Sequence, residues 1–201
     1  MSVQRQPGLC TPNAPPTAQP ILGQRSKAIQ AYGAAVNYPL ALSEEVRKAS
    51  ITGLNQILAD SIYLRDMYKK GQWQVTGATF MQIHKMFGKH FKKQNMLVDK
   101  IGDRVQILGG VAVAVPHDVA AMTRIERPPI DREELPVQLS RLLEAHEAIL
   151  KECHELVKLA TANGDDGTME LIADHVIRPH ERQVWRLSAH LTDTPEVCAS
   201  K

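Results

Sequence analysis

Four long segments of this sequence carry an apolar residue at every third or fourth position, and no segment shows the strict alternation of a β-strand. The spacing predicts helices from Ser43 to about Lys70, from beyond Gly77 to Gly109–Gly110, from Asp131 to about Asn163, and through Ile172 and Leu191. A helix with one apolar stripe is stable only when that stripe is buried, so the four helices must share a core. The sequence therefore predicts an all-α four-helix bundle.

The expected helix ends depend on capping residues. Ser43 is an N-cap for the first helix, and Gly71 is expected to close that helix. Asp131 and Glu134 form a candidate capping pair for the third helix, whereas Pro179 is predicted to kink the fourth.

A crossover from Val111 to Ile130 joins the two predicted helical hairpins, with three prolines and room for one short helix from about His117 to Thr123. This is the arrangement of ferritin-like bundles, although helix count alone leaves an unrelated helical bundle open. The proline-rich residues 1–42 are expected to form a tail that is mobile unless it lies along a neighbouring subunit. Residues 43–192 then form the bundle, and residues 193–201 form a short C-terminal tail.

Composition narrows the class of protein. Aromatic residues make up only 4% of the chain, so aliphatic side chains must fill the core. A net charge of +2 is too small to define a nucleic-acid-binding protein, and no apolar run is long enough to span a bilayer. Cys10, Cys153 and Cys198 are expected to be free thiols in a reducing compartment. Because the N-terminus lacks an apolar leader, we expect a soluble, cytoplasmic protein.

The stretch from Leu54 to Gly110 carries QW-x-V-x-G-x-x-F-x-x-x-H, then D-x-x-x-D-R and LGG, and ADHVIRPHERQVWRLSAHL follows near the C-terminus. These motifs resemble the Dps family of mini-ferritins over nearly all residues after the tail. MTRIERPP and RLLEAHEAILKE look most like its cyanobacterial branch. Members of the family form dodecameric shells that oxidise ferrous iron, often with hydrogen peroxide, and store the ferric mineral. Some members also coat DNA.

The chain contains no Glu-x-x-His pair. Di-iron bundles that hold both metal ions within one subunit use such pairs, so this bundle must place an iron site elsewhere or have none. The resemblance implies a site between subunits, built from the end of the first helix and the face of the second.

The resemblance also assigns the positions of that site. The family uses a histidine before the Trp, a histidine twelve residues later and an aspartate four further on, with an aspartate and a glutamate from the partner subunit. His84 and Asp99 match this pattern, and Asp103 replaces the glutamate with a side chain shorter by about one C–C bond. Gln72 offers only an amide oxygen and Gly88 no side chain, so iron binding should be weaker.

Asp99 and Asp103 lie four residues apart and share a helix face, as two ligands of one metal ion require. The alternative is a solvated pair of carboxylates beside Lys100 and Arg104.

Two further histidines fall on or near apolar stripes. His90 and His180 are expected to point inward together with Gln94. They form either a histidine-rich metal site, able to take zinc as well as iron, or a pair of core histidines satisfied by hydrogen bonds. The other histidines singled out are expected at the surface or at an interface: His146, His154, His175 and His190.

Two features near the predicted site have a functional and a purely structural interpretation. Relatives use the tryptophan at Trp73 as an oxidisable group and for interface packing, and packing alone explains it equally well. Asp165, Asp166 and Glu170 resemble the acidic segment that lines the threefold pores of the shell. They would equally suit a loop followed by a helix N-terminus.

The resulting hypothesis is a ferroxidase: a homo-oligomeric, probably dodecameric by resemblance, shell subunit that oxidises ferrous iron with peroxide or dioxygen at the dimer interface and protects against oxidative stress. The alternatives are a storage or metal-binding shell whose centre has lapsed, and a DNA-coating protein. DNA binding has weak support, because the tail carries only Arg5, Arg25 and Lys27 before the first helix. The basic run of the second helix is typical of a solvated face and contains Lys85, Lys89, Lys92 and Lys93.

Overall fold

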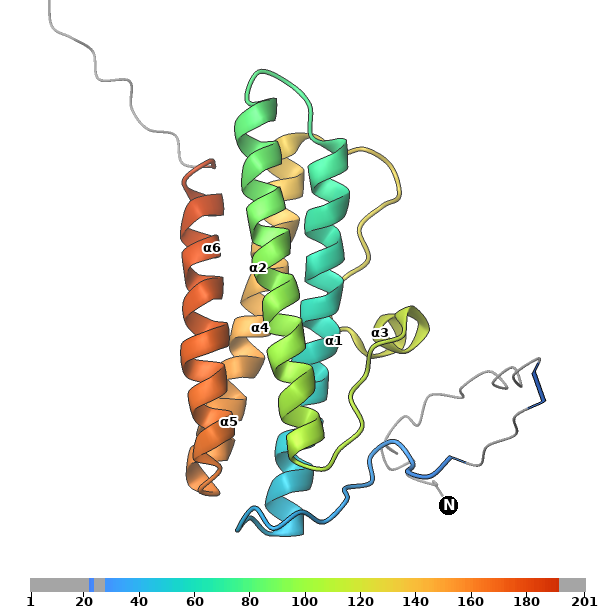
Figure 1. The fold of residues 1–201 in the computed structure, drawn as a ribbon. Helices are drawn as coiled ribbons and strands as arrows, with labels where there is room; N and C mark the ends of the chain where they lie inside the picture. Colours follow the sequence, from blue (N-terminus) through green and yellow to red (C-terminus); the bar gives the residue numbers. More distant parts are fainter. Residues whose placement is uncertain (1–21, 24–27, 192–201) are drawn as a thin grey trace, which may run out of the picture.

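The computed structural model describes residues 22–23 and 28–191, which form an all-helical bundle (Figure 1). Its long helices are α1 (Glu44–Gln74), α2 (Phe80–Ile107), α4 (Leu135–Ala162) and a fourth composed of α5 (Asp166–Glu170), η1 (Leu171–Ile177) and α6 (Arg178–Ser188). The short helix α3 (Pro116–Met122) lies in the crossover. No strand occurs in the described residues, and the predicted all-α four-helix bundle with a short crossover helix is confirmed.

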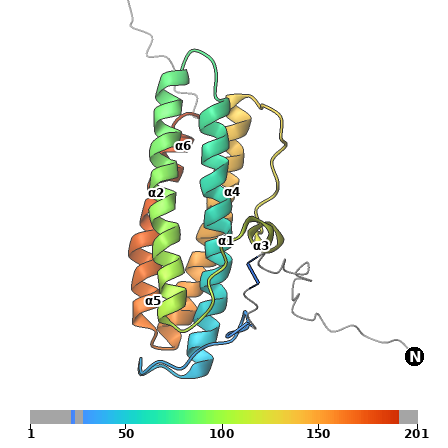
Figure 2. The same cartoon turned by 45° about the vertical axis from the view of Figure 1, so that its right-hand side comes forward.

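Successive long helices pair as two hairpins, and α3 lies against α1 on the outside of the bundle (Figures 1 and 2). The core is mostly aliphatic, as the low aromatic content predicts. Tyr68 of α1 and Phe87 of α2 meet edge to face there, with ring centroids 5.8 Å apart. The buried aliphatic side chains around them include Leu54, Leu58, Ile83, Ile101, Leu142, Ile149, Ile172 and Leu187.

Helix α1 continues past Gly71 to Gln74, so the prediction that Gly71 closes the helix was wrong. Gly71 is needed for a close approach between helices instead. A Cβ atom at this position would lie 2.9 Å from Cε2 of Phe87 on α2. Because α1 is longer than expected, Gln72 and Trp73 lie in its last turn and are held by a helix rather than by a loop.

Helix α4 begins at Leu135, with Glu134 as an N-cap that makes no side-chain hydrogen bond. The predicted capping pair of Asp131 and Glu134 is therefore wrong. Pro136 in the first turn explains where the helix starts. The fixed φ of proline suits the first helical turn, and its missing N–H would have had no partner there.

The fourth long helix is not continuously α-helical. Residues Leu171–Ile177 form a π-helical segment that ends just before Pro179. Proline cannot donate a backbone hydrogen bond to the preceding turn, so this turn is a place where α-helical bonding is already interrupted. Where the sequence predicts a kink at Pro179, the structure shows a change of helix type next to it.

Part of the predicted N-terminal tail lies against its own bundle. The backbone N–H of Val36 and the side-chain amide of Gln30 each donate to the Gly109 carbonyl at 2.8 Å. The buried guanidinium of Arg47 on α1 donates to the Val36 carbonyl and, at 3.0 Å, to Asn37 Oδ1. These contacts anchor the segment to the subunit that contains it.

Cys153 is buried in α4 as a free thiol, and burial raises its pKa, so this sulfur is a core side chain. Cys10, Cys198 and the predicted tail 193–201 lie outside the described residues. None of the described helices is both long and apolar enough to cross a membrane.

Candidate metal centre

His84 lies in the second turn of α2 and faces the end of α1. Its Nδ1–H donates to the backbone carbonyl of Gln72 at 2.9 Å, one of the carbonyls that the last turn of a helix leaves free. With the proton on Nδ1, the lone pair of this half-buried ring is on Nε2. A histidine that binds a metal ion is usually oriented by such a hydrogen bond from its other nitrogen.

Gln72 and Gly88 occupy the two positions where expected ligands are replaced, and they fit together. A Cβ atom at Gly88 would lie 2.6 Å from Nε2 and 3.3 Å from Cδ of Gln72. The Oε1 of the same amide accepts a hydrogen bond from Lys69 Nζ at 3.2 Å. Gln72 therefore directs N–H donors, which cannot bind a cation, into the space that an aspartate at position 88 would fill.

Asp99 and Asp103 are on the same helix as His84, but 15 and 19 residues further along the chain. At a rise of 1.5 Å per residue, they lie roughly 22 to 28 Å from it. Both carboxylates are exposed, and neither forms an ion pair within the part of the chain that the structure describes. A single subunit does not bring His84 and the two aspartates together, so a joint site requires a second copy of the chain.

Trp73 follows Gln72 and is 71% exposed. The ammonium group of Lys69 lies 5.4 Å from the Trp73 ring and 4.7 Å from the Phe91 ring. This end of the bundle thus presents a large aromatic surface that is available for packing against another subunit.

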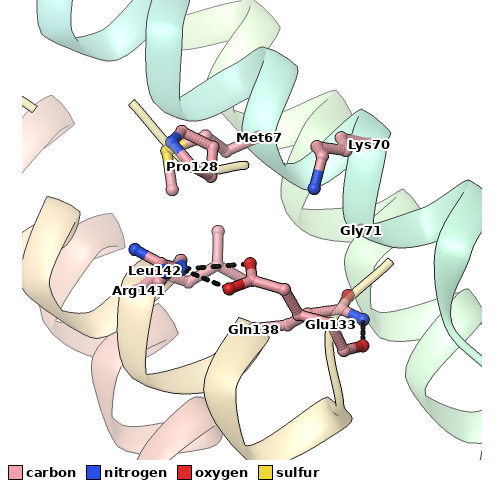
Figure 3. A pocket seen from close by; sticks show the side chains of 8 residues that line it. All are labelled: Met67, Lys70, Gly71, Pro128, Glu133, Gln138, Arg141 and Leu142. Carbon is pink, nitrogen blue, oxygen red and sulfur yellow. Dashed lines mark hydrogen bonds and ion pairs between the residues drawn. The ribbon is translucent and has the colours of Figure 1, made fainter. Parts of the chain in front are cut away.

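A small cavity separates the end of α1 near Gly71 from the start of α4 (Figure 3). Arg141 Nε donates to both carboxylate oxygens of Glu133, at 2.9 and 3.0 Å, and the Gln138 amide donates to the Glu133 carbonyl at 2.7 Å. The cavity volume of about 20 Å³ is enough for about one water molecule. These contacts hold the end of α1 in place and do not form a binding site.

Other histidines lie in the middle of the bundle. His146 Nε2 is 2.6 Å from the Tyr68 hydroxyl, and His146 Nδ1 is 3.0 Å from His180 Nδ1. Gln94 Nε2 lies 3.2 Å from His180 Nε2 and can only donate, so His180 Nδ1–H donates to His146 Nδ1. His146 Nε2–H then donates to the Tyr68 oxygen. This series, here called the core histidine chain, consists of Gln94, His180, His146 and Tyr68.

His146 was expected at the surface or at an interface, but it is fully buried within the subunit, so that prediction was wrong. Its spacing contains the missed signal, because it stands four residues after Leu142 and three before Ile149 on the apolar stripe of α4. Tyr68 is also fully buried and was not singled out from the sequence. The remaining histidines expected at the surface are exposed: His154, His175 and His190.

His90 and His180 both point inward, as predicted. His180 is a core histidine satisfied by hydrogen bonds. His90 is 2% exposed, its ring lies 5.1 Å from the Tyr68 ring, and neither of its nitrogens has a hydrogen-bond partner among the described residues. Those residues contain no cluster of three or more His, Cys, Asp or Glu side chains that could hold a metal ion. The histidine-rich iron or zinc site is therefore not supported.

Burial lowers the pKa of each buried histidine. It lowers the pKa of His180 to about 3, and burial together with Arg186 lowers the pKa of His90 to about 4. The pKa of His146 is well below its usual range because of burial and its two histidine neighbours. All three rings are neutral near pH 7, which agrees with one N–H on each ring of the core histidine chain.

Asp165 is 1% exposed, so the prediction that it lines a pore was wrong. It caps α5 by accepting the Thr168 N–H at 3.1 Å, accepts the Ser50 hydroxyl at 2.6 Å and pairs with Arg104. Burial alone would raise the pKa of this carboxyl, but these hydrogen bonds and the Arg104 charge lower it overall. The other two predicted pore residues are exposed: Asp166 and Glu170.

Comparisons with known proteins agree with this architecture. The chain matches the family model of the ferritin-like domain over residues 51–197. An uncharacterized protein from Kitasatospora aureofaciens is 42% identical over 149 residues, which are 74% of this chain and 99% of the relative. The DNA protection during starvation protein of Halobacterium salinarum is 26% identical over 138 residues, which are 69% of this chain and 76% of that protein.

Among solved structures, DpsC from Streptomyces coelicolor has a TM-score of 0.83 and 47% identity, with 85% of this chain and 99% of that chain covered. An archaeal Dps homologue from Halobacterium salinarum has a TM-score of 0.82 at 23% identity, covering 87% and 97%, a likeness that shows the fold alone. Fold and family match together define a ferritin-like protein. Within that class, the chain belongs to the Dps family.

Proposed function

We propose that the chain is a mini-ferritin subunit that oxidises ferrous iron at a site between two copies and stores the ferric product in a shell. The observation that carries this proposal is the orientation of His84. Its Nδ1–H is held by the Gln72 carbonyl at 2.9 Å, which leaves the Nε2 lone pair for a metal ion.

The second copy would supply the oxygen ligands. Asp99 and Asp103 are exposed, share a helix face and make no ion pair in the described part of the chain. One imidazole and two carboxylates form a ligand set that suits ferrous iron. Each Fe²⁺ would lose one electron to peroxide or dioxygen. Asp166 and Glu170 remain proposed as residues that attract iron toward the shell, because both are exposed.

A second candidate function is a storage shell without fast iron oxidation. The fit between Gln72 and Gly88 favours it, because the amide N–H donors fill the place of the aspartate that relatives use. Lys69, whose ammonium binds the other end of the amide, adds a positive charge close to the site. Both features weaken cation binding.

The decisive experiment measures ferrous oxidation by peroxide and by dioxygen, followed optically. We compare the unaltered protein, a His84→Ala/Asp99→Ala variant and a control variant His154→Ala/Asp131→Ala, whose residues are exposed and remain outside the proposed site. Oxidation that is lost at least about tenfold only in the first variant supports the ferroxidase. A rate in the unaltered protein that is no faster than in the site variant contradicts it.

Restoring the family ligands separates the two candidates further. Gly88→Asp alone would collide with Gln72, so it is made together with Gln72→His. A lapsed centre should gain oxidation sharply in this double variant, whereas a working variant centre should change little or lose activity.

Shell formation and DNA coating need separate measurements. Relatives form the basis of the shell proposal, which predicts a particle near twelve times the 22.3 kDa chain mass by light scattering. DNA coating rests on the names of relatives such as the nutrient stress-induced DNA-binding protein of Nostoc, which is 28% identical over 154 residues. No retardation of DNA in a gel, even at low salt, would exclude it.

A further inference from the structure

Helices α2 and α6 enclose a groove that is rich in positive charge (Figure 1). Lys89 and Lys93 line it from α2, and Arg178, Arg182 and Arg186 line it from α6. Residues four apart share a helix face, so the two rows of cations face the same space. The groove has a volume of about 480 Å³.

This charge is not neutralised within the described structure. One carboxylate lines the groove, that of Asp174, and it is paired with Arg178 through an Nη1–Oδ1 contact of 2.6 Å. The other cations of the groove make no ion pair among the described residues: Lys89, Lys93, Arg182 and Arg186. Like charges held this close repel one another, and an anion between them would relieve that repulsion.

The inner side of the groove is closed by His90 and Gln183. His90 is almost completely buried, and both its ring nitrogens are without a hydrogen-bond partner. A neutral imidazole carries one N–H, and a buried donor without an acceptor is unfavourable. Lys89 and Arg186 on either side are exposed, flexible side chains that can move to admit a ligand. An oxygen ligand in the groove would satisfy His90.

We propose that this groove is a binding site for a small tetrahedral oxyanion of the phosphate type, with His90 donating to one of its oxygens. Guanidinium groups match the oxygens of phosphate in geometry and charge. A metal cation is disfavoured here, because it would meet five positive side chains. The proposal does not depend on iron oxidation.

The phosphates of duplex DNA are another source of the same chemistry, but the shape of the groove favours the free ion. Neighbouring helix axes are only about 8–10 Å apart, so a DNA duplex cannot enter the space between α2 and α6 to reach His90. The row from Arg178 to Arg186 extends only about 12 Å along α6. The site therefore fits one or two small anions.

The test is titration calorimetry of the intact protein with orthophosphate at low ionic strength, with ³¹P NMR line broadening as a second measurement. The groove variant is Lys89→Gln/Lys93→Gln. Its matched control is Lys85→Gln/Lys92→Gln, which removes the same charge from the same helix at positions that do not line the groove. A third variant, His90→Phe, keeps a ring but removes the donor. Circular dichroism checks that all variants are folded.

We expect the groove variant to bind phosphate at least tenfold more weakly, the control to change less than twofold, and His90→Phe to lose affinity severalfold. Equal losses in groove and control variants would overturn the proposal, because they would indicate general surface charge. So would no phosphate binding by the unaltered protein at millimolar concentration. Retardation of a DNA duplex that depends on the groove lysines and that phosphate does not compete away would assign the charge to nucleic acid instead.

Discussion

His84 and the core histidine chain are two histidine-containing regions that this bundle treats differently. His84 uses one nitrogen to bind the Gln72 carbonyl and keeps the other for a ligand. His146 and His180 use both nitrogens inside the protein, so neither has a lone pair left for a metal ion. The comparison shows that the state of the second nitrogen, more than burial or spacing, separates a candidate ligand from a structural histidine.

The largest expected effect is the loss of the core histidine chain. His146→Ala leaves the Tyr68 hydroxyl and His180 Nδ1 without partners and opens a cavity, so we expect the free energy of unfolding to fall by about 3–5 kcal/mol. Urea denaturation measures this. His154→Ala, at an exposed position of the same helix, is the control and should cost less than about 0.5 kcal/mol. Similar losses in both variants would show that the chain is not a stabilising element.

Acid should destabilise the protein through the same chain. The folded state keeps His90, His146 and His180 neutral, while the unfolded state takes up their protons below pH 6.5. Stability therefore falls as pH drops from 6.5 toward about 4, by about 1.4 kcal/mol per pH unit for each histidine.

One buried carboxyl opposes this trend. Burial and the neighbouring Asp60 raise the pKa of Glu152 to about 8, so the folded state holds a proton that the unfolded state releases above pH 4.5. Its contribution to stability is present below pH 4.5 and is lost as the pH rises through 8. Between pH 6.5 and 5 we expect a net loss of roughly 2–4 kcal/mol on acidification, measured by urea denaturation at both pH values. A flat profile would mean that the histidines are charged in the folded state.

A comparison of two helical glycines separates close packing from helix propensity. Gly71→Ala should destabilise by about 1–3 kcal/mol, because its Cβ would lie 2.9 Å from the buried Phe87 ring. Gly102→Ala on α2 meets no atom within 4 Å and should stabilise by roughly 0.5–1 kcal/mol. Thermal unfolding of both variants gives the signs. A stabilising Gly71→Ala would refute the close approach of α1 and α2.

The smallest expected effect is at His84. His84→Ala removes one hydrogen bond from a half-buried ring, so unfolding should become easier by less than about 1 kcal/mol, while iron oxidation is lost. Stability and oxidation are measured on the same preparation. A stability loss as large as that of His146→Ala would place His84 with the structural histidines.

The sequence predicted the existence of each long helix, because apolar periodicity depends only on local spacing. It missed the ends that depend on tertiary contacts. Gly71 looks like a helix terminator until Phe87 is known to pack against it. Asp131 looks like a cap until Pro136 is seen to occupy the first turn of α4.

Site residues show the same limit. The orientation of His84 needs the Gln72 carbonyl, and the origin of Gly88 needs the Gln72 amide, neither of which spacing reveals. Asp165 looks like a pore residue because an acidic loop gives no sign that Ser50 and Arg104 bury its carboxylate. His146 is different, since the stripe of α4 already contained the information.

The π-helical segment Leu171–Ile177 makes the length of this stretch matter as much as its composition. Each residue of an α-helix turns the chain by about 100°, so deleting one residue here would turn every later side chain of α6 by that amount. His180 would then leave the core and a charged neighbour would replace it. A relative with one residue fewer in this segment should therefore carry a different pattern of buried positions downstream, and an ungapped alignment through it would pair residues that face opposite environments.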